Sequence, residues 1–129
     1  MIVVDSSVFV AVFAGEPDAA QFTRALTRPV GRSMSAGNYL ECAIVAERRW
    51  GGRIDLDTWL ARRDVEVVPV DLRLAQLAAD AFARFGKGRH AAGLNYGDCF
   101  AYALAKSLDA PLLYKGGDFT ETDIEPALV

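Results

Sequence analysis

The chain has 129 residues, 52% of them hydrophobic and 24% charged, which is enough to fold as one domain, residues 1–129, around a core of its own. Its 14 basic and 17 acidic residues give a net charge of −3, so the chain lacks the overall basic excess typical of nucleic-acid-binding domains, although a local basic face is compatible with it. The longest apolar run, Val8 to Ala14, is too short to span a bilayer, and no basic leader precedes it. We therefore expect a cytoplasmic protein that makes no membrane contact, with Cys42 and Cys99 as buried hydrophobic residues rather than a disulfide.

The first half of the chain alternates between strand patterns and helical patterns. The β-branched residues 2–4 predict a strand, and Ser6 or Ser7 is placed to cap a helix after it. Further on, Leu40 and Ile44 are spaced four apart, which predicts that they face the core from one helix. In order, we expect a strand at 2–4, a helix from 8 that stops at 15, a helix from 17 that ends before 29, a strand at 32–35 and a helix that stops at the glycine pair 51–52.

The second half repeats this alternation. Asp71 is placed to cap a long amphipathic helix that Gly86 closes, and Pro69 marks the end or edge of the strand before it. In order, we expect a short helix at 56–60, a strand at 65–70, a helix from 72 to 85, a loop at 86–95, a helix at 97–107, a strand at 112–114 and an edge strand near 127–129. Strands separated by helices pair in parallel, so the sequence predicts an α/β fold of three layers, with helices on both faces of a central sheet of four to five parallel strands.

Two acidic residues follow predicted strands. Asp5 comes directly after the first strand, and because Ser6 or Ser7 can cap the next helix, the acid is surplus to capping. Asp118 lies just beyond the last strand, where an ordinary turn acid is the alternative. Ligands of open parallel sheets bind outside the carboxyl ends of the strands, so both positions favour a site.

Two further acids lie on predicted helices. Glu41 lies beside the stripe that contains Leu40, and spacing alone leaves its role open. Asp98 can form a capping box with Asn95, which is a sufficient structural explanation for it. The helix that follows is apolar nearly all round and is therefore expected to be buried, which favours an Asp98 side chain that points into a cleft.

Four acids gathered at one sheet edge repel one another unless a cation lies between them. The sequence thus predicts a site for Mg²⁺, with Mn²⁺ as a plausible substitute, held directly or through water by Asp5 and Asp98. Glu41 would share the ion or orient the attacking water, and a metal-activated water needs no histidine base.

Positive charge gathers before the helix that carries Asp98, at the end of the preceding helix and in the loop after it. Arg84, Lys87 and Arg89 are candidates for contacts with the phosphate backbone of a nucleic acid. The alternative is that they are solvated and complement the end of the preceding helix.

Four segments together carry a resemblance: Met1–Val8, Asn38–Glu41, Leu94–Ala105 and Leu112–Phe119. In this order and spacing the chain resembles PIN-domain ribonucleases, and more narrowly the VapC toxins of bacterial toxin–antitoxin pairs. The resemblance implies a PIN-like fold and a Mg²⁺-dependent endoribonuclease that hydrolyses RNA phosphodiester bonds. It also implies a homodimer that is inhibited by a small cognate antitoxin.

The resemblance carries over Asp5, Glu41 and Asp98 as the acidic set, with Ser6 or Ser7 in support. The chain departs from the family at Gly116, where many relatives have an acid three residues before the phenylalanine matched by Phe119. Asp118 is then the candidate for the fourth acid, acting through water or not at all.

Two other classes of protein fit parts of the sequence. A phospho-accepting receiver-like α/β domain would use an aspartate such as Asp71 and a lysine such as Lys115, but it needs a second acid directly after the first strand, where this chain has serines. A catalytically silent PIN-fold interaction module is the other alternative, and the glycine at position 116 favours it.

Overall fold

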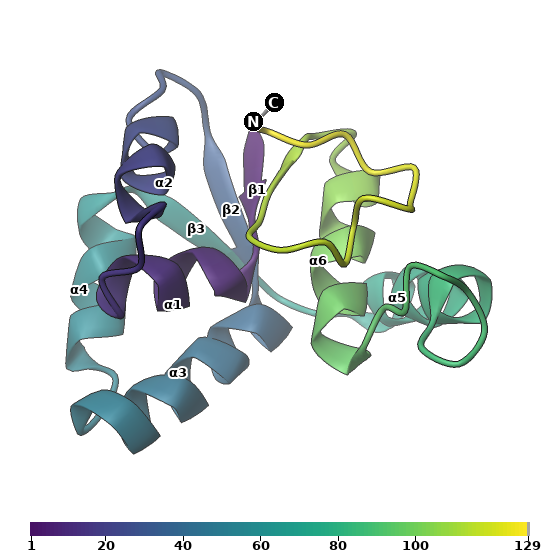
Figure 1. Cartoon of the computed structure of the whole chain (residues 1–129), viewed down its shortest axis with the longest axis horizontal. Coiled ribbons are helices and arrows are strands. Elements are labelled where there is room, and N and C mark those ends of the chain that lie inside the picture. The colour runs from purple at the N-terminus through teal and green to yellow at the C-terminus, as the bar shows by residue number, and fades with distance from the viewer. Residues whose placement is uncertain (129) are drawn as a thin grey trace.

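The chain alternates strands and helices in the order that the sequence predicts, as the computed structural model shows for residues 1–128 (Figure 1). The patterns that predict each element are local, so their order survives folding. The elements are β1 (Ile2–Val4), α1 (Ser6–Phe13), α2 (Ala19–Ala25), β2 (Arg32–Ser35), α3 (Ala36–Trp50), α4 (Ile54–Arg62), β3 (Val65–Val68), α5 (Leu72–Phe85), α6 (Tyr96–Ser107) and β4 (Leu112–Leu113).

The four strands form one parallel sheet in the order β3-β2-β1-β4. Val3 of β1 pairs with Ser33 of β2 on one side and with Leu112 of β4 on the other. The chain leaves β1 toward β2 and β3, and returns to the opposite side of β1 only with β4. The order therefore reverses between β1 and β4, and the crevice outside their carboxyl ends is where ligands of such sheets bind.

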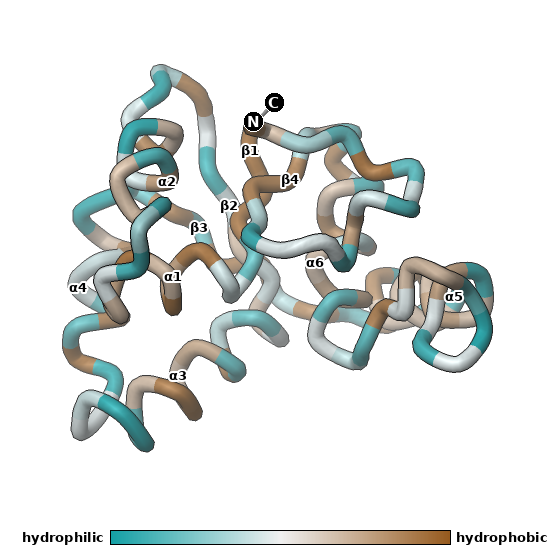
Figure 2. Tube along the Cα trace, viewed as in Figure 1, coloured by the Kyte–Doolittle hydropathy of each residue, from teal (hydrophilic) through white to brown (hydrophobic). Residues whose placement is uncertain are grey.

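Helices cover both faces of this sheet, which confirms the predicted three-layer α/β fold. In Figure 1, α1, α2 and α4 lie on one side of β1, and α5 and α6 lie on the other. The buried hydrophobic residues form two cores, one on each face of the sheet. Successive residues of β1 point to opposite faces, so Ile2 and Val4 belong to the first core and Val3 belongs to the second. Figure 2 shows the resulting concentration of hydrophobic residues along β1 and β4.

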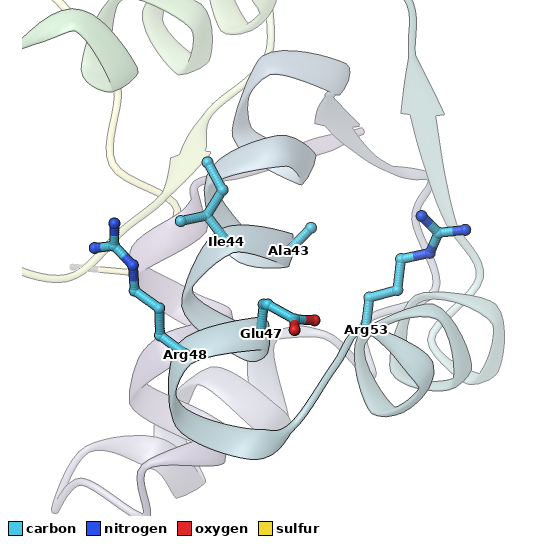
Figure 3. Close-up of a pocket in the computed structure, with 5 residues that line it drawn as sticks. All are labelled: Ala43, Ile44, Glu47, Arg48 and Arg53. Atoms are coloured by element: carbon cyan, nitrogen blue, oxygen red, sulfur yellow. The ribbon is translucent and has the colours of Figure 1, made fainter.

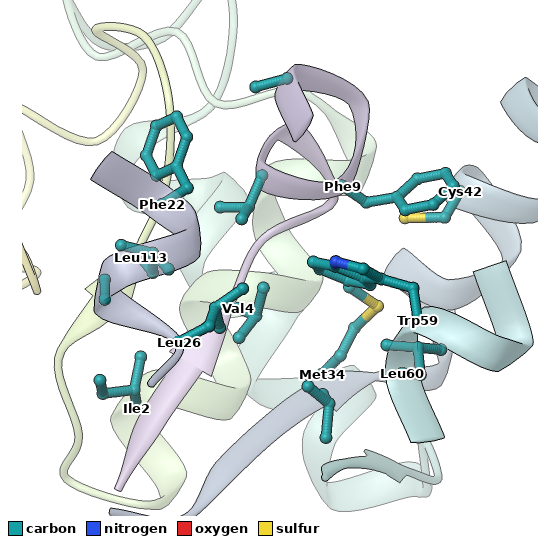
Figure 4. Packing of buried hydrophobic residues seen from close by; sticks show 14 of the residues in the cluster. Ile2, Val4, Phe9, Phe22, Leu26, Met34, Cys42, Trp59, Leu60 and Leu113 are labelled. Atoms are coloured by element: carbon teal, nitrogen blue, oxygen red, sulfur yellow. The ribbon is translucent and has the colours of Figure 1, made fainter. Parts of the chain in front are cut away.

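Aromatic and sulfur-containing side chains fill the first core. Phe9, Trp59 and Met34 gather there, and the ring centroids of Phe9 and Trp59 are 5.5 Å apart (Figure 4). Cys42 lies in this core and Cys99 in the other, and both thiols are free, as expected for buried hydrophobic residues. No helix among residues 1–128 combines the length and the apolar character needed to cross a membrane.

The buried face of α3 differs from the prediction. Leu40 and Ile44 are 59% and 45% exposed, whereas Asn38, Cys42 and Ala46 are buried. Residues 40 and 44 form one stripe with helical spacing, and residues 38, 42 and 46 form another. Which stripe is buried depends on the elements that α3 packs against. The prediction for Leu40 and Ile44 was wrong because α3 rests on α1 and α6 along the stripe that begins with a polar residue.

Several element boundaries also differ from the prediction. The second helix begins at Ala19 rather than at Pro17, and β3 ends at Val68, before Pro69, at the edge of the sheet. A prolyl residue lacks the N–H that a longer strand would need. Beyond β4, Pro126 makes one parallel bridge to Leu112 in place of the expected edge strand at 127–129, and residue 129 of that prediction lies outside the described residues.

Candidate functional site

A cavity of about 280 Å³ opens at the carboxyl ends of β1 and β4, where the strand order reverses. All four acids singled out from the sequence line it, although they come from segments as far apart as residues 5 and 118. Ser6, Ser7 and Asn95, the predicted supporting residues, line it as well. The complete lining is Asp5, Ser6, Ser7, Val10, Glu16, Glu41, Asn95, Asp98, Lys115, Asp118 and Phe119.

Asp5 lies at the junction of β1 and α1 and is 4% exposed. Its Oδ2 accepts a hydrogen bond from the Ser7 amide at 3.0 Å, so Asp5 itself is the N-cap of α1. The expectation that Ser6 or Ser7 caps this helix was wrong, because both serine residues lie within the first helical turn. Burial raises the pKa of Asp5 to about 6, and repulsion by the Glu41 carboxylate adds to the shift.

Asp98 lies in the first turn of α6 and is 8% exposed. It forms the expected capping box: Asp98 Oδ2 accepts from the Asn95 amide at 3.0 Å, and Asn95 Oδ1 accepts from the Asp98 amide at 2.9 Å. Burial, together with the carboxylates of Asp118 and Asp5, raises the pKa of Asp98 to about 7. The capping box and a position in the cavity are thus compatible, because capping uses one carboxylate oxygen.

Glu41 reaches the cavity from the second turn of α3. Its Oε1 accepts hydrogen bonds from the Ser6 hydroxyl at 3.1 Å and from the Asn38 side-chain amide at 2.8 Å. Asn38 Nδ2 also donates to the Gly97 carbonyl of α6 at 3.0 Å. The sequence reading missed Asn38, and its position one helical turn before Glu41 is the signal that could have found it.

Lys115 is a second residue that the sequence reading did not place in the site. Its amide donates to Ser7 Oγ at 3.0 Å, and its ammonium group lies 2.6 Å from Glu16 Oε2 and 3.0 Å from Asp18 Oδ1. These hydrogen bonds raise the pKa of Lys115. Lys115 follows β4 almost as directly as Asp5 follows β1, and this shared position at strand ends could have indicated it.

The basic residues proposed as RNA contacts do not line the cavity. The guanidinium group of Arg84 lies 3.4 Å from Asp123 Oδ2 and stacks over the Phe85 ring. Lys87 and Arg89 are exposed in the loop that joins α5 to α6. They remain candidates for a longer substrate that extends beyond the cavity.

Other features of the surface and of α5 do not share this chemistry. A hollow of about 380 Å³ lies beside the exposed face of α3, and its lining includes Ile44, Arg48 and Arg53, with Glu47 as its one acid (Figure 3). Asp71, the aspartate that a receiver-like domain would use, is an exposed N-cap of α5 and does not line the acidic cavity.

The donors in the acidic cavity fit a hard divalent cation, because they are carboxylate oxygens whose mutual repulsion and burial already raise two pKa values. No three or more His, Cys, Asp or Glu residues among residues 1–128 close on one point as a complete cage. Mg²⁺ does not require such a cage, since it commonly takes one or two carboxylates and keeps several waters. Asp5 and Asp98, the two buried acids, are the residues that would hold it.

Comparisons with known proteins agree with this geometry. Residues 2–125 match the family model of the PIN domain. The Ribonuclease VapC of Mycolicibacterium smegmatis is 50% identical over 125 residues, covering 95% of this chain and 97% of that protein. Ribonuclease VapC30 of Mycobacterium tuberculosis is also 50% identical over 125 residues, covering 95% of each chain.

Two solved structures show the same fold at lower identity. Mycobacterium tuberculosis VapC20, described as a toxin that cleaves the sarcin–ricin loop, has a TM-score of 0.76 at 20% identity over 96% of both chains. A toxin–antitoxin complex from Klebsiella pneumoniae has a TM-score of 0.72 at 16% identity, over 95% of this chain and 93% of that chain. The family match and the close sequence relatives together show that this chain belongs to the PIN-domain family and, within it, to the VapC ribonucleases.

Proposed function

We propose that this chain is a Mg²⁺-dependent endoribonuclease that acts in the cytoplasm as the toxin of a toxin–antitoxin pair. The observation that carries the proposal is the convergence of Asp5, Glu41, Asp98 and Asp118 on one cavity at the carboxyl ends of β1 and β4. Membership of the VapC ribonucleases supports RNA as the substrate.

The two buried acids and Glu41 have different tasks in this proposal. Asp5 and Asp98, each fixed by a hydrogen bond from a backbone amide, would hold Mg²⁺ or Mn²⁺. When bound, the ion supplies charge stabilisation at the scissile phosphate and lowers the pKa of a water ligand. Glu41 is held by Ser6 and Asn38 and orients the attacking water, and in-line attack leaves a 5′-phosphate and a 3′-hydroxyl.

This chemistry does not need a histidine base. The chain has one histidine, His90, whose Nδ1 accepts a hydrogen bond from the Ala92 amide in the loop before α6. His90 does not line the cavity. Hydrolysis by water also does not use the 2′-hydroxyl as a nucleophile, which is the step that usually requires such a base.

The partner in this proposal is a small antitoxin that packs on the toxin and reaches the acidic cavity, and the toxin itself forms a homodimer. The presence of a toxin–antitoxin complex among the structural neighbours supports an antitoxin. Light scattering of the purified chain measures its oligomeric state, and a monomeric mass at micromolar concentration would contradict the dimer.

Cleavage of RNA by the purified, antitoxin-free chain tests the activity. We expect cutting with Mg²⁺, none with EDTA, and a loss of about a thousandfold or more in Asp5→Asn and in Asp98→Asn, as for other residues that hold the reacting centre. Asp80→Asn, which removes an exposed acid from α5, is the matched control and retains the wild-type rate. Undiminished cutting in EDTA, or by both cavity variants, contradicts the proposal. A wild-type chain that cuts no RNA above background supports the silent interaction module instead.

A further inference from the structure

The Glu41 carboxylate lies in a socket made by three elements of the fold. Ser6 of α1 and Asn38 of α3 both donate hydrogen bonds to Glu41 Oε1, at 3.1 Å and 2.8 Å. Gly97 of α6 forms the third wall, and it touches the carboxylate because it has no side chain. The sequence already indicated Ser6 as a supporting residue, whereas it did not indicate Asn38 or Gly97 as residues of the site.

Asn38 is fully buried, with 0% of its surface exposed, and both of its amide hydrogens are used. One is donated to Glu41 Oε1 and the other to the Gly97 carbonyl at 3.0 Å. Its own Oδ1 has no hydrogen-bond partner among residues 1–128. A buried acceptor without a partner costs stability, so an apolar residue of similar size would serve the core better. The amide is therefore explained by the two hydrogen bonds that it donates, one to the Glu41 carboxylate and one to α6 at the Gly97 carbonyl, rather than by apolar packing.

Gly97 leaves open the space that the Glu41 carboxylate occupies. A Cβ atom built on Gly97 would overlap the Glu41 carboxylate, with Oε1 at 2.6 Å and its other atoms closer still. The φ angle of Gly97 is not in the left-handed region, so its backbone conformation suits any residue. Alanine is also a better helix former than glycine. If Glu41 did not lie beside α6, replacing Gly97 by alanine would stabilise the helix.

We propose that Asn38 and Gly97 are positioning residues that together fix the orientation of the Glu41 carboxylate toward the acidic cavity. The proposal rests on the proposed function, in which Glu41 orients the attacking water. Asn38 acts through a hydrogen bond to the carboxylate, and Gly97 acts by leaving room for it. The hydrogen bond can therefore be removed in one variant and the room filled in another. Both changes displace the same carboxylate.

Three single variants test the socket, and a fourth serves as their control. Asn38→Leu removes the amide and keeps the volume, and Asn38→Ser is the smaller substitute if leucine does not fold. Gly97→Ala fills the space. Tyr39→Phe is the matched control, because it removes a side-chain hydrogen bond from the neighbouring residue of α3, the 2.6 Å hydrogen bond from Tyr39 to Asp57, which lies outside the cavity.

We expect each socket variant to lower kcat about 10- to 100-fold with little change in KM for RNA, as misplacement of a reacting group does. Tyr39→Phe retains the wild-type kcat. In a Glu41→Gln background the socket variants cause no further loss, because they act through Glu41. Losses that multiply with that of Glu41→Gln, or a wild-type kcat in both Asn38→Leu and Gly97→Ala, overturn the proposal.

Crystal structures of the variants separate this proposal from the proposed function. We expect the Glu41 carboxylate to leave its wild-type place in Gly97→Ala and to lose its single orientation in the Asn38 variant. A carboxylate that stays in place in both overturns the socket, whether or not the protein cuts RNA. A wild-type chain without nuclease activity overturns the proposed function, while displacement of Glu41 in the variants still supports the socket.

Discussion

The cavity contains two kinds of acid, an inner pair and an outer pair, and the difference between them lies in how the fold holds each. Asp5 and Asp98 are 4% and 8% exposed and each accepts a hydrogen bond from a backbone amide at the start of a helix. Glu41 is half-buried and bonded only by side chains, and Asp118 is exposed. The carboxyl groups of the inner acids are therefore held by backbone amides, whereas the position of the Glu41 carboxylate depends on the side chains of its neighbours.

The inner pair also shows which electrostatic effect is the larger. A helix N-terminus and a backbone N–H both favour the charged form of a carboxyl, and on the surface they would lower its pKa. In Asp5 and Asp98 the pKa is nevertheless raised, to about 6 and about 7, because burial outweighs the hydrogen bonds that favour the charged form. The fold thus holds two acids in a place where their charged forms are costly unless a cation is bound.

The largest expected effect is on the pH dependence of stability in EDTA. The pKa values of Asp5 and Asp98 in the folded chain lie above their ordinary value of 3.8, so the folded state binds more protons than the unfolded state. Their contribution to stability is fully present below about pH 4 and is lost as pH rises through 6 and 7, by on the order of 3 kcal/mol for Asp5 and about 4 kcal/mol for Asp98. Urea unfolding of wild type, Asp5→Asn and Asp98→Asn across this range measures it.

The matched comparison for this prediction is again Asp80→Asn, whose exposed acid gives it the wild-type pH profile. The asparagine variants are expected to gain stability over wild type at pH 8, since a neutral side chain carries no desolvation cost there. Variants that follow the wild-type profile throughout would show that the inner acids are not destabilising when charged.

Mg²⁺ should restore the stability that the folded chain loses as pH rises. At a concentration of one hundred times its dissociation constant, a ligand of the folded state adds about 2.7 kcal/mol of stability. The rise in melting temperature should be larger at pH 8 than at pH 5.5, because protons compete for Asp5 and Asp98. Thermal unfolding with Mg²⁺ or Mn²⁺ measures the rise, and an equal rise in Asp5→Asn and Asp98→Asn would place the ion elsewhere.

The outer pair is tested by Asp118→Asn. We expect the cleavage rate to fall about tenfold, or about 1.4 kcal/mol, which is far less than for an inner acid. Because the Asp118 carboxylate raises the pKa of Asp98, its removal lowers that pKa and moves the acid limb of the rate–pH profile to lower pH. A loss as large as that of Asp5→Asn would mean that Asp118 belongs with the inner pair.

The smallest expected effect concerns the basic loop outside the cavity. If Lys87 and Arg89 bind the RNA backbone, replacing both by alanine raises KM about two- to fivefold and leaves kcat unchanged. For a single-stranded RNA, the slope of log affinity against log salt should fall by about 0.7 for each phosphate that the variant no longer neutralises. Arg53→Ala, from the hollow beside α3, is the control and leaves the salt slope as it is.

Some features could be read from the sequence because their causes are local. The capping box of Asn95 and Asp98 spans four residues, and the apolar residues after it predict a buried helix wherever that helix lies. The order of strands and helices is predictable for the same reason, since each follows from periodicity within about a dozen residues. The parallel pairing then follows from the helices between the strands.

Other features depend on contacts between distant segments. Leu40 and Ile44 have the spacing of a buried stripe, yet α3 packs through Asn38, Cys42 and Ala46, because Gly37 lies against the Phe100 ring of α6 and Asn38 bonds to the Gly97 carbonyl. The cap of α1 is a similar case. Asp5 takes this role from the serine residues because the path of the chain out of β1 places the serines inside the helix.

By itself, the sequence determined the α/β class, the order of the elements and the four acids that deserved testing, because strand and helix ends are marked by neighbouring residues. Only the tertiary structure decided that the acids share one cavity, that two of them are buried with raised pKa values, and that Asn38, Gly97 and Lys115 surround them. The physical reason is that burial, repulsion and close approach depend on distances across the fold, and those distances arise only when α1, α3 and α6 meet at the edge of the sheet.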